Sequence, residues 1–345
     1  MLNLMLHDDW EIYGDGSGDP EILMFDPAKR VLDICDQYGA KYTFYAEIGQ
    51  QLNMLNAPEG KWARYANKWE TILKDAIARG HDVQLHFHPQ WIGAELKNGQ
   101  WILDFNKWNT AKVNGALLDD WIGKGAAYLR QLLLAVDPDY ELLSFRAGGW
   151  MCQPSKNLYR ALKNHRIICD VSVVKGRYQK FADGSIVDFR SAHSCFEPWE
   201  VDPDDFSNKK EGSGLWELPV YSETARLTHS VYLLTKSFSP MYYYKISKRR
   251  QVQKGGGRYS PKVVKIGKPK AYYGSFGYMH YRHLLKYVRQ VKKYTQKTNK
   301  TGHLIFLTHS KSFLDFNNFN QLLNSLSQME GIKFNRTTDF IRKIL

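Results

Sequence analysis

The sequence predicts an α/β fold in which parallel strands are joined by helices and close, or nearly close, into a barrel. Segments with the pattern of buried strands alternate with segments of helical periodicity along most of the 345 residues, an order typical of parallel sheets with helical crossovers. About seven strands are predicted, which suits a barrel better than an open doubly wound sheet. No Gly-x-Gly-x-x-Gly follows the first strand and no Walker loop is present, which argues against a nucleotide-binding sheet. The predicted class is therefore a distorted (β/α)7-type barrel.

The first half of the chain contains three predicted strands and two helices. Residues 1–6 are almost entirely apolar, as in a buried strand. The first helix begins at Asp26-Pro27, where proline suits the first turn, and ends at Gly39. Residues that favour strands mark the next element, and apolar residues at helical spacing mark the second helix. In order, these elements cover 1–6, 26–38, 41–48, 62–79 and 81–89.

Residues 14–20 form a glycine-rich loop between the first strand and the first helix. Asp15, Ser17 and Asp19 have the spacing of ligands in a calcium loop. Pro20, however, stands where such a loop needs its sharp-turn glycine. We therefore predict a flexible loop without a calcium ion.

The second half continues the alternation, with one long interruption. Residues 175–214 lack periodicity and are rich in turn residues, and a basic segment follows them. We predict a single domain over 1–345, with an irregular insertion at 175–214 and a basic insertion at about 225–300. The other predicted elements are helices at 115–136, 155–164, 282–297 and 317–329, strands at 142–146, 167–173, 215–220, 303–307 and 332–335, and a short final helix.

The net charge of +13 is concentrated in one part of the chain. No acidic residue lies between Glu223 and Asp315, whereas Lys and Arg occur there twenty times. A solvated lysine-rich face is one explanation. A phosphate-bearing partner is the other: a nucleotide-linked sugar, a lipid-pyrophosphate-linked glycan or the anionic inner leaflet of a membrane. The tyrosine runs at 242–244 and 272–273 would suit a membrane interface.

The sequence predicts a cytoplasmic protein, with a peripheral position at the inner membrane face as a further option. No apolar run approaches the length of about 20 residues that spans a bilayer. The carboxylates after the first strand leave no room for a signal peptide. The four cysteines are scattered without a Cys-x-x-Cys motif, as expected of core residues in a reducing compartment.

Two adjacent carboxylates, Asp8 and Asp9, follow the first apolar strand. Carboxylates at the end of a buried strand repel each other and lose hydration unless a cation lies beside them. Successive strand residues point to opposite faces, so the two can do different jobs only if the chain turns there. The pair suits a site in which one carboxylate binds a metal and its neighbour handles a proton. In isolation, a helix cap or a solvated turn would give the same pattern.

A His-x-His sequence ends the third predicted strand. His86 and His88 lie on the same face because they are two residues apart, and Pro89 ends the strand. With Asp9 at the corresponding end of the first strand, we predict a metal site made by Asp9, His86 and His88. Three protein ligands leave positions open to water, as in catalytic sites. Mixed imidazole and carboxylate ligands favour zinc, with cobalt, nickel or manganese as alternatives, over magnesium or calcium.

An arginine and a glycine pair mark the end of the next strand. Arg146 could pair with Asp8 and hold it ionised. Gly148 and Gly149 would let the backbone approach a ligand closely. A structural salt bridge with a glycine turn is the alternative explanation.

Two tryptophans are candidates for substrate binding, and a histidine is a further candidate for catalysis. Trp150 offers a flat apolar face of the kind that stacks on sugar rings, and Trp91 is the second substrate-binding candidate. His309 ends a late apolar strand, on the face where the loops after barrel strands build active sites.

Together these stretches resemble the polysaccharide deacetylase family, the NodB-homology domain of carbohydrate esterase family 4, in order along nearly the whole chain. His7-Asp8-Asp9 is similar to the family's Thr-Phe-Asp-Asp motif, and the segment from Gly80 to His86 to its Gly-His-Glu-Ile-x-x-His motif. Further matches are Lys41 to Tyr45 with the second strand, Phe145-Arg146 with the start of the Arg motif, Leu215 to Pro219 with the penultimate strand, and Leu307-Thr-His309 with the closing Leu-x-His.

The resemblance implies a metal-dependent hydrolase that removes an N-acetyl or other acyl group from an amino sugar. It implies that Asp8 is the catalytic base, that Asp9 and His86 bind the metal, that Arg146 is the partner of the base and that His309 is the general acid. A metal-activated water would attack the acyl carbonyl. With the basic segment, this activity points to surface-glycan assembly, such as that of lipopolysaccharide O-antigen.

The chain departs from the family pattern in two places. The family's second metal histidine lies four residues after the first, where this chain has Gln90, so His88 is the nearby substitute. The Arg motif continues with Ala-Gly-Gly in place of the family's usual proline. A different substrate groove is therefore expected.

Two other function classes fit parts of the sequence. A barrel that keeps its metal but lacks catalysis could act in glycan recognition or assembly. A nucleic-acid binder could use the basic, aromatic-interleaved segment with the barrel as scaffold, although we expect no nucleic-acid partner. Acetate release from N-acetylated sugars, together with metal analysis, separates the enzyme from both.

Overall fold

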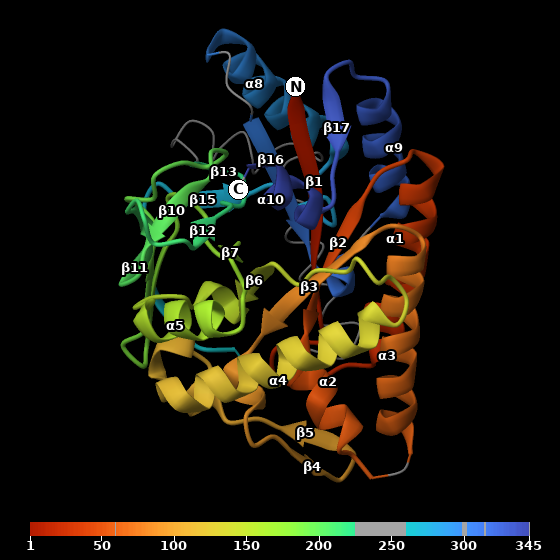
Figure 1. Cartoon of the computed structure of the whole chain (residues 1–345), viewed down its shortest axis with the longest axis vertical. Helices are drawn as coiled ribbons and strands as arrows, with labels where there is room; N and C mark the ends of the chain where they lie inside the picture. The colour runs from red at the N-terminus through yellow and green to blue at the C-terminus, as the bar shows by residue number, and fades with distance from the viewer. Residues whose placement is uncertain (59, 225–259, 299–301, 314, 345) are drawn as a thin grey trace.

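The structure, a computed structural model, describes residues 1–58, 60–224, 260–298, 302–313 and 315–344 (Figure 1). Its centre is one strongly curled, mixed sheet in the order β11-β10-β12-β7-β6-β3-β2-β1-β16, with β17 also paired to β1. Its strands are β1 (Leu2–Trp10), β2 (Tyr42–Glu47), β3 (Asp82–Phe87), β6 (Ser144–Ala147), β7 (Cys169–Asp170), β10 (Trp199–Asp202), β11 (Asp205–Lys209), β12 (Trp216–Glu217), β16 (Gly302–Thr308) and β17 (Ile332–Phe334). The predicted α/β barrel-like class is confirmed, in the form of a half-barrel.

The middle of this sheet is parallel and buried. β16, β1, β2, β3, β6, β7 and β12 pair in parallel, whereas β10 pairs antiparallel with β11 and β12. Every residue of β1, β2 and β3 is buried, as expected of strands with helices on one face and the barrel interior on the other. All these parallel strands therefore end on one side of the molecule.

Strand pairing does not close the barrel in the described part of the chain. The sheet path begins at β11 and ends at β16. The segment after β12 narrows the gap: Val220 N donates to Val173 O (3.0 Å), and Tyr221 N donates to Ile305 O (3.2 Å). Isolated backbone hydrogen bonds thus join the β7 side to β16.

Helices cover the outer face of the sheet (Figure 1). α1 begins at Asp26-Pro27 and is followed by Gly39 at φ +61°, as the proline and glycine predict. The predicted helices are confirmed, with ends that differ by at most two residues. They are α1 (Asp26–Gln37), α3 (Lys61–Ala78), α4 (Gly115–Leu134), α5 (Lys156–Asn164), α8 (Tyr281–Thr298), α9 (Phe316–Ser327) and α10 (Thr337–Ile344), and α2 (Ile48–Leu55) is an addition to the prediction.

Residues 175–214, which show no periodicity in the sequence, contain four short strands. β8 (Tyr178–Phe181) pairs with β9 (Ile186–Asp188) and with β14 (Val263–Ile266), and β10 and β11 extend the main sheet. Strands of three to five residues are too short for alternation to stand out. A second small hairpin, β4 (Glu95–Lys97) with β5 (Gln100–Ile102), follows β3.

The predicted basic insertion lies partly outside the described residues. Residues 225–259, including the tyrosines at 242–244, are among those not described. The described part contains β14, β15 (Ala271–Tyr273), which pairs with β13 (Ser222–Thr224), and α8. Among the described residues, no helix combines the length and the apolar character needed to cross a bilayer.

The buried side chain of His303 makes the stability of the fold depend on pH. The side chain is fully buried in β16, with its ring 5.2 Å from that of Phe340. Burial lowers the pKa of His303 to about 4, whereas an unfolded chain has a His pKa near 6.5. The unfolded state therefore binds the extra proton first, and stability is lost as the pH falls from about 6.5 towards 4.

We expect His303→Phe to remove this acid sensitivity. A folded pKa near 4 corresponds to about 3 kcal/mol of stability lost across that range. Urea unfolding of both proteins at pH 7 and pH 4.5 measures the difference. Equal losses in the wild type and the variant would contradict the assignment.

Candidate metal centre

Strand register brings the candidate residues together at the carboxyl end of the sheet. Glu47 in β2 pairs with His86 in β3, and His86 pairs with Arg146 in β6. In β1, Asp9 pairs with Tyr45, so Glu11, just beyond the strand, follows on the same face as Asp9. These positions face the barrel interior at one level, and they are all buried.

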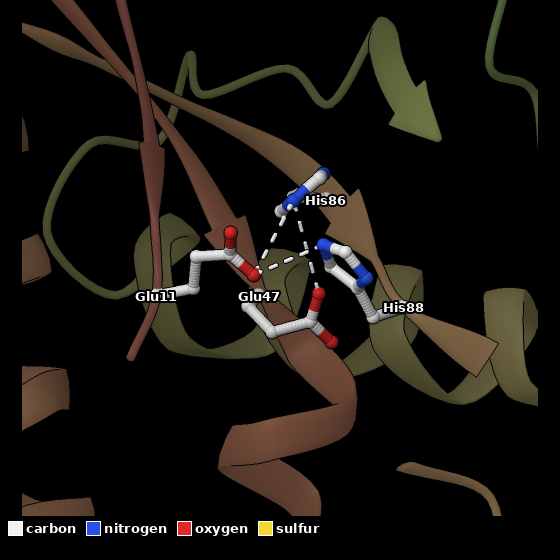
Figure 2. Close-up of side chains that lie close together, drawn as sticks. All are labelled: Glu11, Glu47, His86 and His88. Carbon is white, nitrogen blue, oxygen red and sulfur yellow. Dashed lines mark ion pairs between the residues drawn. The ribbon is translucent and has the colours of Figure 1, made fainter. Parts of the chain in front are cut away.

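Four of the side chains form a compact group (Figure 2). One ligand atom from each of Glu11, Glu47, His86 and His88 lies within 4.8 Å of the others. His88 Nε2 is 3.0 Å from Glu11 Oε2, and His86 Nε2 is 3.8 Å from that oxygen and 4.0 Å from Glu47 Oε2. Two imidazoles and two carboxylates therefore converge on one small volume, where they could hold a metal ion.

The hydrogen bonds around this group leave two buried atoms for a cation. His86 Nδ1 is 2.9 Å from Arg146 O, and Glu47 Oε1 accepts from Gly49 N (2.8 Å). The opposite atoms, His86 Nε2 and Glu47 Oε2, are buried and have no hydrogen-bond partner in the described part of the chain. Orphaned buried polar atoms are costly. Their pairing of a nitrogen with a carboxylate oxygen suits zinc or another first-row divalent ion.

Burial and the charges within the group shift the pKa values of Glu47 and His88. Burial raises the pKa of Glu47 to about 8. Burial opposes charge on His88 as well, but the carboxylate of Glu11 raises the pKa of His88 to about 9. Without a cation, the group therefore holds protons on both residues at neutral pH. A divalent ion would release them, so metal binding is coupled to proton loss.

His88 is positioned by Gln90 and Gly148. Gln90 Nε2 lies 2.9 Å from His88 Nδ1 and donates to Gly14 O (3.1 Å). Gln90 therefore orients His88 and does not itself join the group of four. A Cβ added at Gly148 would lie 2.5 Å from His88 Nδ1, so only glycine leaves room for this imidazole.

We therefore expect Gly148→Ala to displace His88 and weaken divalent-metal binding by about 10- to 100-fold, as losses of outer supports of ligands do. Isothermal titration with zinc measures the affinity. Gly14→Ala is the matched control, because its Cβ would lie an ordinary 3.7 Å from Gln90 Nε2. Equal affinities of the two variants would contradict this role for Gly148.

Arg146 pairs with Asp9, which corrects the expected pair with Asp8. Its Nη1 donates to Asp9 Oδ1 (2.6 Å), Nη2 is 2.7 Å from His7 Nδ1 and Nε donates to Val171 O (2.9 Å). The reason is alternation: His7 and Asp9 face the interior, where Arg146 is fully buried, and Asp8 does not. Burial opposes ionisation of Asp9, but the positive charges of Arg146, His86 and His309 together outweigh it and lower the pKa of Asp9.

Asp8 points to the opposite face of β1. Its Oδ1 accepts from Ser310 N (2.8 Å), and its Oδ2 accepts from Tyr42 Oη (3.1 Å) and from Ser310 Oγ. Burial raises the pKa of Asp8 to about 7. These contacts tie β1 to the turn after β16. A role for Asp8 as base stays a prediction.

His309 and Lys311 border the group from the turn after β16. His309 Nε2 lies 3.6 Å from Asp9 Oδ2 and 3.9 Å from Glu11 Oε1. Its side chain is 22% exposed, compared with 12% for His88 and 1% for His86. Lys311 Nζ donates to Glu11 Oε1 (2.7 Å). His309 is therefore the side chain through which solvent reaches the group.

Asp9 lies outside the group of four, and its role as a ligand stays a prediction. The two tryptophans proposed for substrate binding are largely buried. Trp91 is 1% exposed and packs on Trp101 (5.6 Å between rings), and Trp150 is 8% exposed beside Tyr273 (5.5 Å). Neither presents an open ring face here, and substrate contact stays a prediction for both.

Sequence reasoning missed Glu11, Glu47 and Lys311. Glu11 could have been identified from the sequence, because it lies two residues after Asp9 and so shares its face. Glu47 could also have been identified, as a carboxylate at the end of a buried strand. No sequence pattern points to Lys311, because its position depends on how the chain turns after β16.

No family model matches the sequence, and no curated protein matches it. The structure is similar to a protein of Mycobacterium smegmatis assigned as a polysaccharide deacetylase (TM-score 0.50, 11% identity, covering 99% of this chain and 90% of that one). It is also similar to the PuuE allantoinase (0.50, 12%, 99% and 89%) and to a GH57 branching enzyme of Thermococcus kodakaraensis (0.53, 12%, 100% and 71%). At these identities the likeness shows the fold that such proteins share, and no specific family.

Proposed function

We propose that this chain is a metal-dependent hydrolase that removes an N-acetyl or other acyl group from an amino sugar, in the assembly of a surface polysaccharide such as O-antigen. The observation that carries the proposal is the buried group of Glu11, Glu47, His86 and His88, with two orphaned atoms, at the carboxyl end of the barrel strands. The deacetylase motifs in the sequence and the fold shared with a protein assigned as a polysaccharide deacetylase support this reaction class.

Glu11, Glu47, His86 and His88 would hold the ion, with Asp9 at the edge of the group. A bound divalent cation supplies Lewis-acid polarisation and lowers the pKa of water. Arg146 keeps Asp9 ionised. Lys311 holds Glu11 Oε1, so that Oε2 faces the histidines. The chain thus fixes its carboxylates before any ligand arrives, which is the arrangement that electrostatic catalysis needs.

We assign the proton transfers to His309. Burial lowers the pKa of His309 to about 4, so its imidazole is neutral at pH 7 and can accept a proton at Nε2. Asp9 and Glu11 lie within 4 Å of that nitrogen and would stabilise the imidazolium. In place of Asp8, the base that the resemblance implies, His309 would take a proton from the attacking water, and it would then deliver that proton to the leaving amine. The partial exposure of His309 supports entry of substrate from this side.

Acetate release from N-acetylated glucosamine oligosaccharides tests the proposal. We expect turnover by the metal-loaded protein, loss of turnover with a chelator, and recovery when zinc, cobalt, nickel or manganese is restored. His309→Gln should lower turnover by about 100-fold or more and leave the metal content unchanged. Acetate release that is indifferent to chelator would overturn the metal's role, and release of reducing ends without acetate would indicate glycoside hydrolysis.

The basic segment supports a second part of the proposal, contact with an anionic membrane. Arg282, Lys286, Arg289, Lys293 and Lys297 are three or four residues apart, so they share one exposed face of α8. No ion pair joins them to another described residue, and 260–298 contains no acidic residue. We propose that this face attracts anionic headgroups. Binding to anionic vesicles should weaken steeply with salt, and binding that salt does not change would contradict it.

A further inference from the structure

A cavity of about 520 Å³ lies beside the metal centre and shares none of its four residues. Three segments form its walls: the loop after β1, the start of α3 and the β4–β5 hairpin. These segments follow β1, β2 and β3, so the cavity opens at the same end of the barrel as the metal centre. Its lining combines aromatic rings with charged groups, among them Trp62, Tyr65, Trp101, Asp15, Asp19 and Lys61. We call it the aromatic cavity.

The walls of the aromatic cavity are closely packed. Gly16 adopts φ +76°, and a Cβ there would lie 2.8 Å from the Cβ of Trp101. Tyr65 Oη donates to Asp19 Oδ1 (2.9 Å), and Gly16 N donates to Tyr13 O (2.8 Å). The loop expected to be flexible is thus held against the hairpin, because its glycines allow a close approach. A cavity with fixed walls is typical of ligand sites of this size.

The side chain of Gln90 lies between the loop of this cavity and the group of four. Gln90 Nε2 donates to Gly14 O in the loop and lies 2.9 Å from His88 Nδ1. Gln90 O also accepts from Asp104 N, next to Phe105 of the cavity wall. A ligand that spans both places would therefore have one part in the cavity and the next part near the metal centre.

The chemistry of the lining selects the ligand. Trp62 and Trp101 pack against each other and are buried, whereas Tyr65 and Phe105 line the cavity and are half-buried. The apolar C–H faces of a sugar ring pack on partly exposed aromatic rings of this kind. Asp15 and Asp19 can accept hydrogen bonds from hydroxyl groups or from a protonated amine. With Lys61 as the one cation that lines the cavity in the described residues, two carboxylates there repel phosphate and sulfate.

We propose that the aromatic cavity binds a neutral or amine-bearing sugar unit of the glycan, next to the unit that reacts. This inference rests on the proposed function for the identity of the glycan. It adds that the enzyme binds its substrate through sugar rings in this cavity. A phosphate-linked end of the same glycan would then lie elsewhere. Recognition of an amine would favour glycans that already carry a free amino sugar beside the acylated one.

The proposal is tested by measuring the binding of oligosaccharides under conditions in which no turnover occurs. The probes are N-acetylglucosamine tetrasaccharide, its fully deacetylated form and a sulfated tetrasaccharide, each titrated by calorimetry and tryptophan fluorescence in the presence of a chelator. We expect the first two probes to bind, with the deacetylated one at least as tight, and the sulfated one to bind about tenfold more weakly or not at all.

Two variants at exposed positions locate the site with little risk to folding. Asp19→Asn should lower the affinity for the deacetylated probe by about tenfold, which is the contribution of a charge-assisted hydrogen bond. Ile102 lines the cavity and is 50% exposed. Ile102→Lys should therefore lower the affinity for the same probe, because the added positive charge repels its amines. Asp120→Asn, on the exposed face of α4, is the matched control and should change nothing.

The outcomes separate this inference from the proposed function. Tetrasaccharide binding that Asp19→Asn and Ile102→Lys leave unchanged, or equal binding of the sulfated probe, would overturn the cavity assignment and leave acetate release untouched. Binding that depends on Asp19, in a protein that releases no acetate when loaded with metal, would keep the cavity assignment and overturn the hydrolase.

Discussion

His86→Ala is expected to weaken the binding of a divalent metal by more than about 100-fold, because removal of a ligand costs more than removal of its outer support. His86 Nε2 is buried, lacks a hydrogen-bond partner among the described residues and lies about equally far from both carboxylates of the group. Its other nitrogen is held by Arg146 O, so the free nitrogen has a fixed direction. Calorimetric titration with zinc and cobalt, followed by metal analysis of the purified variant, measures the effect.

His193→Ala supplies the control for this variant. His193 is exposed on a loop, and its ring lies 5.8 Å from that of Trp199. We expect its metal content to equal that of the wild type. If His86→Ala retained one tightly bound ion, the group of four would not be the metal centre, and the proposed reaction would lose its main support.

The parallel core and the His-x-His pair could be predicted because both follow from local pattern. Apolar strands and helical periodicity are properties of short windows, and alternation alone puts His86 and His88 on one face. The expected elements therefore match the structure along β1 to β6. The short strands after residue 175 could not be predicted in this way, since β8 pairs with β14 more than 80 residues away.

The carboxylate partners were harder to predict than the histidines. Which of Asp8 and Asp9 meets Arg146 depends on which face of β1 looks inward, and the sequence is apolar on both faces there. Glu47 joins the group only because β2 pairs with β3 in a register that puts it beside His86. Register between strands far apart in the chain is a tertiary property, so only the two histidines of the group of four were predicted.

Arg146→Met is expected to destabilise the protein by about 3–5 kcal/mol, the usual effect of removing one partner of a buried ion pair. Arg146 is fully buried, and it donates to Asp9 Oδ1 at 2.6 Å and to Val171 O at 2.9 Å. The guanidinium also lies over the ring of Tyr45, 4.1 Å from its centroid. Methionine would fill part of the space and leave the Asp9 carboxylate buried without its cation. Urea unfolding of both proteins at pH 7 measures the loss.

A double-variant cycle identifies the cause of this loss. Once Asp9→Asn has removed the buried charge, Arg146→Met should cost at least about 1 kcal/mol less than it does in the wild type, since contacting charged residues are coupled. Arg190→Met is the matched control: Arg190 pairs with Asp188 on the surface, where ion pairs contribute about 0–1 kcal/mol. An equal cost of Arg146→Met with and without the Asp9 charge would mean that packing, and not the ion pair, explains the loss of stability. The arginine would then have no part in keeping Asp9 ionised beside the metal centre.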